Sequence, residues 1–445
     1  MDSSPTSFAG IPSDVGYSGA SLDLSGFQDD IVISYLLSKF SIGFGDRIPN
    51  GADAPTMAVV LTGGMGKSSA YLSGLSLAQA FFGRVHNDDE MSRQSVQLYG
   101  RALTNLRRDL QLADQEEARP RAYMNLWTSL FLGLYEMVSS AGSSKWLQHS
   151  MGVSALTQLA GPEAFQSQAA NAMLESYRSF IAVGHLVQRK HCFLAQPEWK
   201  TIPWAGKGPP KTLTSLICDV LCDIPGLMQD VDAMLESHKL GHDISADKVI
   251  LQETVINSID QLSWLRWQWE AAYPYACAER PTTTDSCVTV DEYGHPLFET
   301  HFEFDSLDRA IDVLNYNSIR LMLYTLGDSA CITDLQLTSS SEYLLREGPG
   351  SNPLVLPGQG DRIGHALEIC RSAEYMMQES RDSQGLLILL FPLRVAFTHL
   401  QKMPKISTWI QRVLGMSGSK GFKLGEHILN LQSQSKPPMK VNAVK

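Results

Sequence analysis

The sequence predicts an all-α protein, built as a large multi-helix bundle or solenoid-like domain with long loops. Apolar residues recur at helical spacing through most of the chain, and runs with a β-type pattern are confined to residues 58–61 and 287–290. Stretches rich in Pro and Gly separate helical segments, at residues 195–212, 280–304 and 338–360. Apolar residues make up 44% of the 445 residues, which is enough material for a large core.

The N-terminal residues 1–56 are expected to form a mostly disordered leader with one short helix. Ser, Gly, Pro and Asp dominate residues 1–28, where apolar periodicity is weak. An amphipathic helix is expected over residues 29–40, because its apolar side chains recur on one face. A loop rich in Gly, Pro and Asp follows over residues 41–56.

Residues 57–430 are expected to form one helical domain, followed by a flexible tail at residues 431–445. Leucines at helical spacing predict helices over residues 91–112, 122–138 and 146–159, and Gly161-Pro162 ends the third. The same reasoning predicts further helices over residues 165–188, 213–238, 247–273, 307–326, 361–379, 384–400 and 405–414.

Composition argues against several classes of protein. Acidic residues outnumber basic ones 47 to 36, so no direct binding of nucleic acid is expected. The longest aliphatic and aromatic run, residues 386–391, is far shorter than the roughly 20 residues of a membrane span, so no membrane association is expected. The seven cysteines are scattered and odd in number, which is typical of reduced thiols in the core of an intracellular protein.

The segment GGMGKS at residues 63–68 resembles the start of a phosphate-binding loop. That loop requires Gly five positions before its Gly-Lys-Ser sequence, and position 61 is Leu. A turn rich in Gly and Ser ahead of a helix is therefore the better interpretation. No nucleotide or other cofactor is predicted.

Two groups of residues have spacings found in metal sites. His301 and Glu303 match two ligands of a facial iron triad, but the strands that usually carry that site are missing, and a polar loop before a helix explains the same residues. Cys218 and Cys222 lie four positions apart on a predicted helix, where two more ligands would be needed. Buried thiols are the better interpretation, so no metal site is predicted.

No catalytic residue is predicted. The sequence has no Gly-x-Ser-x-Gly or His-Glu-x-x-His motif, although a Ser/His/Asp set drawn from distant positions stays open. Trp264 and Trp267 share a face of a predicted helix and are interpreted as packing residues; the alternative is the aromatic wall of a ligand pocket. The basic residues at 189–191 and the lysines at 436–445 are interpreted as solvated surface.

A series of short motifs occurs in a recognisable order: YGRAL at 99–103, YE at 135–136, WLxHxxG at 146–152, GP at 161–162 and FPLR at 391–394. This order resembles the fungal-specific transcription factor domain, the helical regulatory region that normally follows a fungal zinc binuclear cluster. The resemblance extends from about residue 60 to residue 430.

The resemblance marks four polar or aromatic residues as structural anchors of the helical domain: Glu136, Trp146, His149 and Arg394. Trp146 and His149 are three positions apart, so both can meet the end of the preceding helix. Glu136 is expected to bond His149 or to cap a backbone group. Arg394 lies in an apolar segment and needs a carboxylate or carbonyl partner if it is buried.

The zinc cluster of such factors needs six cysteines in two closely spaced triplets beside a basic segment, whereas the first cysteine here is Cys192. The resemblance therefore implies a nuclear transcription regulator without its own zinc-cluster DNA reader, with the cytoplasm as the alternative location. It would regulate transcription, for example of a secondary-metabolite gene cluster, through a protein partner such as a full-length zinc-cluster factor, or through a small-molecule effector. The alternative is a repurposed helical domain that acts as an enzyme or ligand-binding protein in a fungal biosynthetic pathway.

Overall fold

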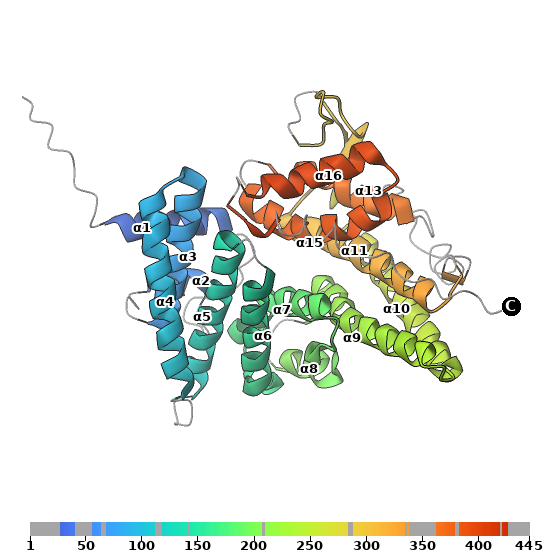
Figure 1. The fold of residues 1–445 in the computed structure, drawn as a ribbon, viewed down its shortest axis with the longest axis horizontal. Coiled ribbons are helices and arrows are strands. Elements are labelled where there is room, and N and C mark those ends of the chain that lie inside the picture. Colours follow the sequence, from blue (N-terminus) through green and yellow to red (C-terminus); the bar gives the residue numbers. More distant parts are fainter. Residues whose placement is uncertain are drawn as a thin grey trace, which may run out of the picture.

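The computed structural model describes residues 27–40, 56–63, 68–111, 118–140, 143–206, 210–283, 288–333, 336–337, 362–378, 382–418 and 421–425. Over these residues the protein is all-α, as predicted, with a small two-stranded sheet (Figure 1). The start of the leader, residues 64–67 of the GGMGKS segment, Cys287 and the lysines at 436–445 lie outside the described residues.

The helices that make up the first half of the fold are α1 (Gln28–Phe40), α2 (Met57–Thr62), α3 (Ser69–His86), α4 (Asp89–Gln111), α5 (Ala118–Ser139), α6 (Ser143–Ala160), α7 (Gln168–Gln188) and α8 (Pro197–Thr201). Those of the second half are α9 (Leu213–Lys239), α10 (Ser245–Ala272), α11 (Leu307–Ser329), α13 (Arg362–Arg371), α14 (Ala373–Met376), α15 (Asp382–Leu400) and α16 (Pro404–Met416). Short 3-10 turns occur at η2 (Pro162–Phe165), η3 (Phe193–Ala195) and η4 (Ile202–Trp204).

Helix α3 is the centre of the N-terminal group and packs against α1, α4 and α5. It begins at Ser68, whose side chain accepts the backbone N–H of Tyr71 at 3.1 Å, and it ends at Asn87 in the left-handed conformation. Its side chains are buried on nearly every face, and at Gly74 an added Cβ would clash with the side chain of Leu61. Because no polar face remains, the helix shows little periodicity, and no range for it follows from the sequence pattern.

The chain runs from the α1–α5 group through α6 and α7 to α9 and α10, and returns through α11 and α15 toward α1 (Figure 1). The C-terminal residues close this path on the N-terminal group. The ring of Phe422 lies 6.0 Å from the rings of both Phe40 and Phe81, and Arg84 Nε donates to the carbonyl of Gly418 at 3.2 Å. Helix α1 is thus part of the packed core.

Both predicted strands are wrong. Residues 58–61 lie in α2, which begins where Thr56 Oγ1 accepts the backbone N–H of Val59 at 3.1 Å. The described residues near 287–290 contribute an isolated bridge between Val290 and Pro296. In a run of four apolar residues, the spacing of the side chains does not distinguish a strand from a helix. At residues 58–61 the cap at Thr56 favours the helix.

The sheet pairs β1 (Cys277–Pro281) with β2 (Thr300–Phe304) in antiparallel register. Strand β2 and the end of β1 lie in the segment 280–304, which the sequence predicts to be a loop. The predicted helices agree with the structure to within a few residues, except that the segment over 361–379 is divided into α13 and α14. Residues Ser383–Leu400 of α15 are long and apolar enough to cross a membrane, but 61% of them are buried, as in a core helix of a helical domain.

Candidate functional site

The motif residues of α4, α5 and α6 meet in one polar cluster. Tyr99 on α4 places its hydroxyl 3.0 Å from Nε2 of His149 on α6, and its ring stacks on Tyr135 of α5 at 4.5 Å. Glu136, the next residue of α5, is 3% exposed and also bonds the Tyr99 hydroxyl. The cluster therefore joins three consecutive helices through side chains.

The proton positions in this cluster follow from its charges. Burial raises the pKa of Tyr99, with a further contribution from its hydrogen bond to Glu136, so the phenol keeps its proton. Burial lowers the pKa of His149, and the nearby Glu136 opposes this effect in part. Since the Tyr99 hydroxyl has a single proton to donate to Glu136, neutral His149 donates from Nε2 to the Tyr99 oxygen. Glu136 is thus linked to His149 through Tyr99.

The other two motif residues lie apart from this cluster. Trp146 is 5% exposed, and its ring lies 6.0 Å from that of Phe180. Arg394 on α15 is half-buried, which lowers the pKa of its guanidinium. Within the described part of the chain, the structure gives Arg394 no ion pair.

Trp264 and Trp267 stack on each other on α10, with ring centroids 4.7 Å apart and an interplanar angle of 16°. Trp264 is 43% exposed, so it is not a core residue. The neighbouring Trp269 takes the buried position instead, where its indole N–H donates to Asp312 at 2.9 Å. The stacked pair lines neither of the two hollows described below.

A buried ionic cluster joins α7 to α9. Arg178 is 1% exposed and donates to Glu175 at 2.7 Å and to Asp219. Lys211 also pairs with Asp219, and its Nζ lies 4.0 Å from the ring centroid of Trp204. The charges balance within the cluster, which indicates a structural role. Glu175 and Arg178 are three positions apart, a spacing that marks a helical ion pair in the sequence.

A second buried network joins α10, α11 and α13. Arg266 pairs with Glu270 at 3.2 Å, and Arg320 donates from Nε to Tyr324 at 2.9 Å. His365 Nδ1 lies 2.7 Å from Oδ1 of Asn317. Burial, together with Arg320 and Arg266, holds the pKa of His365 well below its usual value. These groups are enclosed by the core, so they are placed to hold helices together.

The candidate metal ligands of the sequence are not gathered into a centre. His301 and Glu303 lie on β2, where Glu303 accepts from Gln378 at 3.4 Å. Cys218 and Cys222 lie on α9. Across the described ranges, the structure contains no group of three or more His, Cys, Asp or Glu side chains arranged to hold a metal ion.

One surface hollow among the described residues is an open groove of about 520 Å³ between α1 and Phe82 of α3. Two apolar side chains in this groove face solvent: Phe27 is 60% exposed and Ile31 is 44% exposed. Tyr35 forms the floor with Phe82, whose ring meets it edge-on at 5.3 Å. Asp30 also lines the groove.

Further carboxylates lie on the first turns of α1 and α4. Gln28 Nε2 contacts Sδ of Met91 at 3.7 Å, which places the first turn of α4, with Asp89 and Glu90, beside the first turn of α1. Glu90 is paired with Arg93. Asp29 precedes Asp30 on α1 and accepts from Gln79 of α3 at 3.4 Å. The lining of the groove is therefore mainly apolar and aromatic, with the carboxylate of Asp30 among its residues.

The second hollow, of about 450 Å³, lies at the C-terminal end of α7. It is lined by Gln158, His185, His191, Cys192, Phe193, Ala195 and Gln196. His185 Nε2 is 2.9 Å from the hydroxyl of Ser154, and burial lowers the pKa of this imidazole. No sequence pattern predicts either hollow, because each is assembled from separate helices.

Comparison with known proteins confirms the family resemblance over part of the chain; the match begins before residue 60, and the FPLR motif at residues 391–394 lies outside it. Residues 35–202 match the family model of the fungal specific transcription factor domain, and this region contains the cluster of Tyr99, Glu136 and His149. Uncharacterized protein AN5342 of Emericella nidulans is 30% identical to this chain over 159 residues. The aligned region is 34% of this chain and 33% of that protein, so the chain covers about a third of the relative's length. No solved structure matches the chain.

Proposed function

We propose that this chain, with a fungal specific transcription factor domain at residues 35–202, regulates transcription through a protein partner that binds the groove between α1 and α3. The observation that supports a regulator is the family match. The observation that supports partner binding is the groove itself, in which two large apolar side chains that face solvent line one hollow. Such a regulator acts in the nucleus.

The groove favours one kind of partner. Phe27 and Ile31 offer apolar contact area, and the carboxylate of Asp30 in the lining attracts positive charge. A segment that combines a bulky apolar side chain with Lys or Arg fits both features. A full-length zinc-cluster factor carries a basic segment beside its cluster, so it is the partner that we propose. The small-molecule effector and the control of a secondary-metabolite cluster stay predictions.

A tethered reporter tests the regulatory role. The full chain is fused to a heterologous DNA-binding domain in a fungal host, and the transcript level of a reporter with the matching operator is measured. We expect a several-fold change, upward or downward, relative to the DNA-binding domain alone. Equal reporter output from the two proteins, at equal nuclear abundance, would contradict the proposal.

The location of the chain is measured in the same strain. A fluorescent fusion of the full chain is expected to accumulate in the nucleus. A fusion that stays in the cytoplasm under every growth condition in which the reporter responds would contradict the nuclear assignment.

A further inference from the structure

Helix α4 carries a row of apolar side chains on the side that faces solvent. Val96, Leu103 and Leu110 are each exposed, and they follow one another at intervals of seven residues. Since an α-helix turns once in 3.6 residues, seven residues are close to two full turns, and the three side chains lie along one line of the helix surface. This row is distinct from the buried side of α4, which includes Ala102 and Leu106.

Two further residues belong to the same line. Gly100 lies four positions after Val96, and Arg107 lies four positions after Leu103, so each is a neighbour of the row on the helix surface. A Cβ added at Gly100 would have nothing within 4 Å beyond its chain neighbours and the backbone of its own helix, so the space above this glycine is open. We call the line of Val96, Gly100, Leu103, Arg107 and Leu110 the α4 seam.

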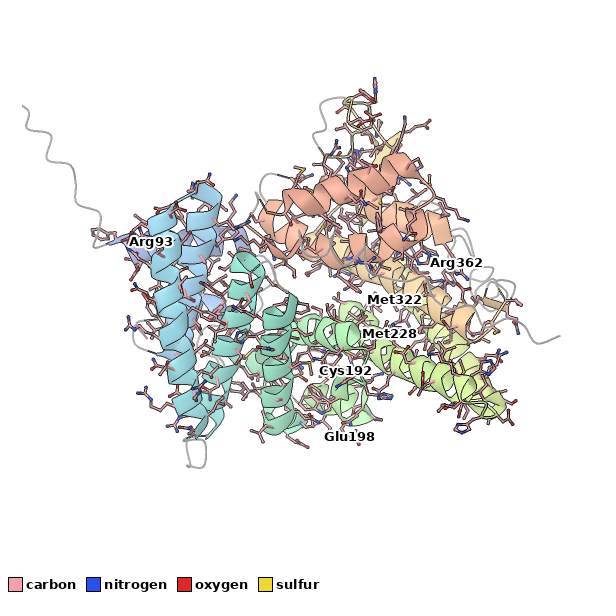
Figure 2. All side chains as sticks on the ribbon, in the orientation of Figure 1. Arg93, Cys192, Glu198, Met228, Met322 and Arg362 are labelled. Atoms are coloured by element: carbon pink, nitrogen blue, oxygen red, sulfur yellow. The ribbon has the colours of Figure 1, made fainter. Side chains whose placement is uncertain are left out.

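The exposed side of α4 also carries unpaired positive charge. Figure 2 labels Arg93 on this helix at the edge of the molecule, where it pairs with Glu90. Over the ranges that the structure describes, Arg101, Arg107 and Arg108 are exposed and form no ion pair. Arg107 lies within the α4 seam, and the other two lie farther round the helix, where they add to the positive potential of this side.

These features favour one kind of partner. An apolar row that repeats every two turns matches the row of a second helix, whose side chains fit between those of the first. A second copy of the α4 seam would bring its own Arg107 to the interface, where like charges repel. Nucleic acid would be held by the arginines alone, since contacts to its phosphates depend on charge and hydrogen bonds and leave the apolar row unused.

We propose that the α4 seam binds an acidic, amphipathic helix of a protein partner. The apolar side chains of that helix pack between Val96, Leu103 and Leu110, and an Asp or Glu beside them pairs with Arg107. The groove between α1 and α3 is a different surface, whose lining carboxylate Asp30 favours a basic segment. The two surfaces therefore select segments of opposite charge.

The test uses the full chain and two fluorescent peptides of about 21 residues, each with three heptads. Both peptides have leucine at the two apolar positions of every heptad, and the flanking positions are Glu in one peptide and Lys in the other. Binding is measured by fluorescence anisotropy at low and at physiological salt. We expect the acidic peptide to bind at least about tenfold more tightly than the basic one, with a larger difference at low salt. Equal binding of the two peptides, or no binding of the acidic one, would overturn the proposal.

Variants assign the binding to the seam. Leu103→Gln and Arg107→Gln are each expected to weaken binding of the acidic peptide about tenfold, and Arg107→Gln is also expected to reduce the salt dependence. The control is Leu159→Gln, which makes the same change at an exposed leucine of α6 and is expected to retain binding. Circular dichroism checks that each variant folds, which is expected because the substituted side chains are exposed.

Three results from the variants and competitors would overturn the proposal. The first is unchanged binding of the acidic peptide in both Leu103→Gln and Arg107→Gln. The second is an oligomer of the unaltered chain that Leu103→Gln dissociates, measured by sedimentation, because it would assign the seam to a second copy. The third is displacement of the acidic peptide by duplex DNA, because it would assign the seam to nucleic acid.

Discussion

Replacing Arg178 with methionine tests how strongly the buried ion cluster holds α7 to α9. The guanidinium is 1% exposed, lies 2.7 Å from Glu175 and pairs with Asp219, which is itself 5% exposed. Methionine keeps an apolar stem but leaves these carboxylates without their shared cation. Removal of one partner of a buried pair costs about 3–5 kcal/mol. Lys211 still pairs with Asp219. We therefore expect the free energy of unfolding to fall by about 3 kcal/mol, the lower end of this range.

That loss is large beside the total stability of about 5–15 kcal/mol of most folded domains. Urea unfolding, followed by circular dichroism, measures it. With an m-value of about 3 kcal/mol per molar urea, the midpoint is expected to fall by about 1 M. Arg189→Met is the matched control, because it removes an exposed pair with Asp232 at 2.6 Å and is expected to cost less than about 1 kcal/mol. Equal shifts for the two variants would refute the reasoning.

Three further predictions concern the motif cluster, the pH dependence and the DNA. Tyr99→Phe leaves buried groups of Glu136 and His149 without a partner, so it is expected to destabilise the fold by about 1–3 kcal/mol in thermal melting, while Tyr275→Phe, at a site 91% exposed, has no effect. Burial, with Arg362, lowers the pKa of His399 to about 4, so between pH 6.5 and that value the unfolded chain binds a proton that the folded chain does not. The free energy of unfolding is therefore expected to fall as the pH drops through this window, and in His399→Gln it is expected to fall less. The same dependence on pH in the variant and in the unaltered chain would contradict this role of His399. In a gel-shift titration with mixed promoter DNA, the purified chain is expected not to bind at low salt, and tight, salt-sensitive binding would reveal a basic surface.

The helices of this protein could be predicted wherever one face is apolar and the other polar. Helix α4 has this pattern, with Met91, Ala102 and Leu106 buried, and its range was predicted closely. Helix α3 was not assigned a range because it is buried all round. The run at residues 58–61 was misassigned because it is too short for its period to be read.

The contacts of the candidate sites could be predicted from the sequence where both residues lie on one helix. Pairs within one helix, such as Arg266 and Glu270, have a spacing that the sequence displays. Contacts between helices, such as that of Tyr99 with His149, depend on how the helices pack, and the motif order indicated them through the family resemblance alone. The groove at Ile31 combines residues of α1 and α3, so no sequence pattern predicts it.

The proposed role of the groove is tested most directly by a matched pair of variants in the tethered reporter. Ile31→Lys places a positive charge in the groove, where Ile31 is 44% exposed, whereas Leu159→Lys makes the same kind of change on α6, where Leu159 is 82% exposed. Both variants are expected to fold as the unaltered chain does. We predict that Ile31→Lys abolishes the change in reporter transcript and that Leu159→Lys retains it. A reporter response that both variants retain in full would contradict binding of the partner at the groove.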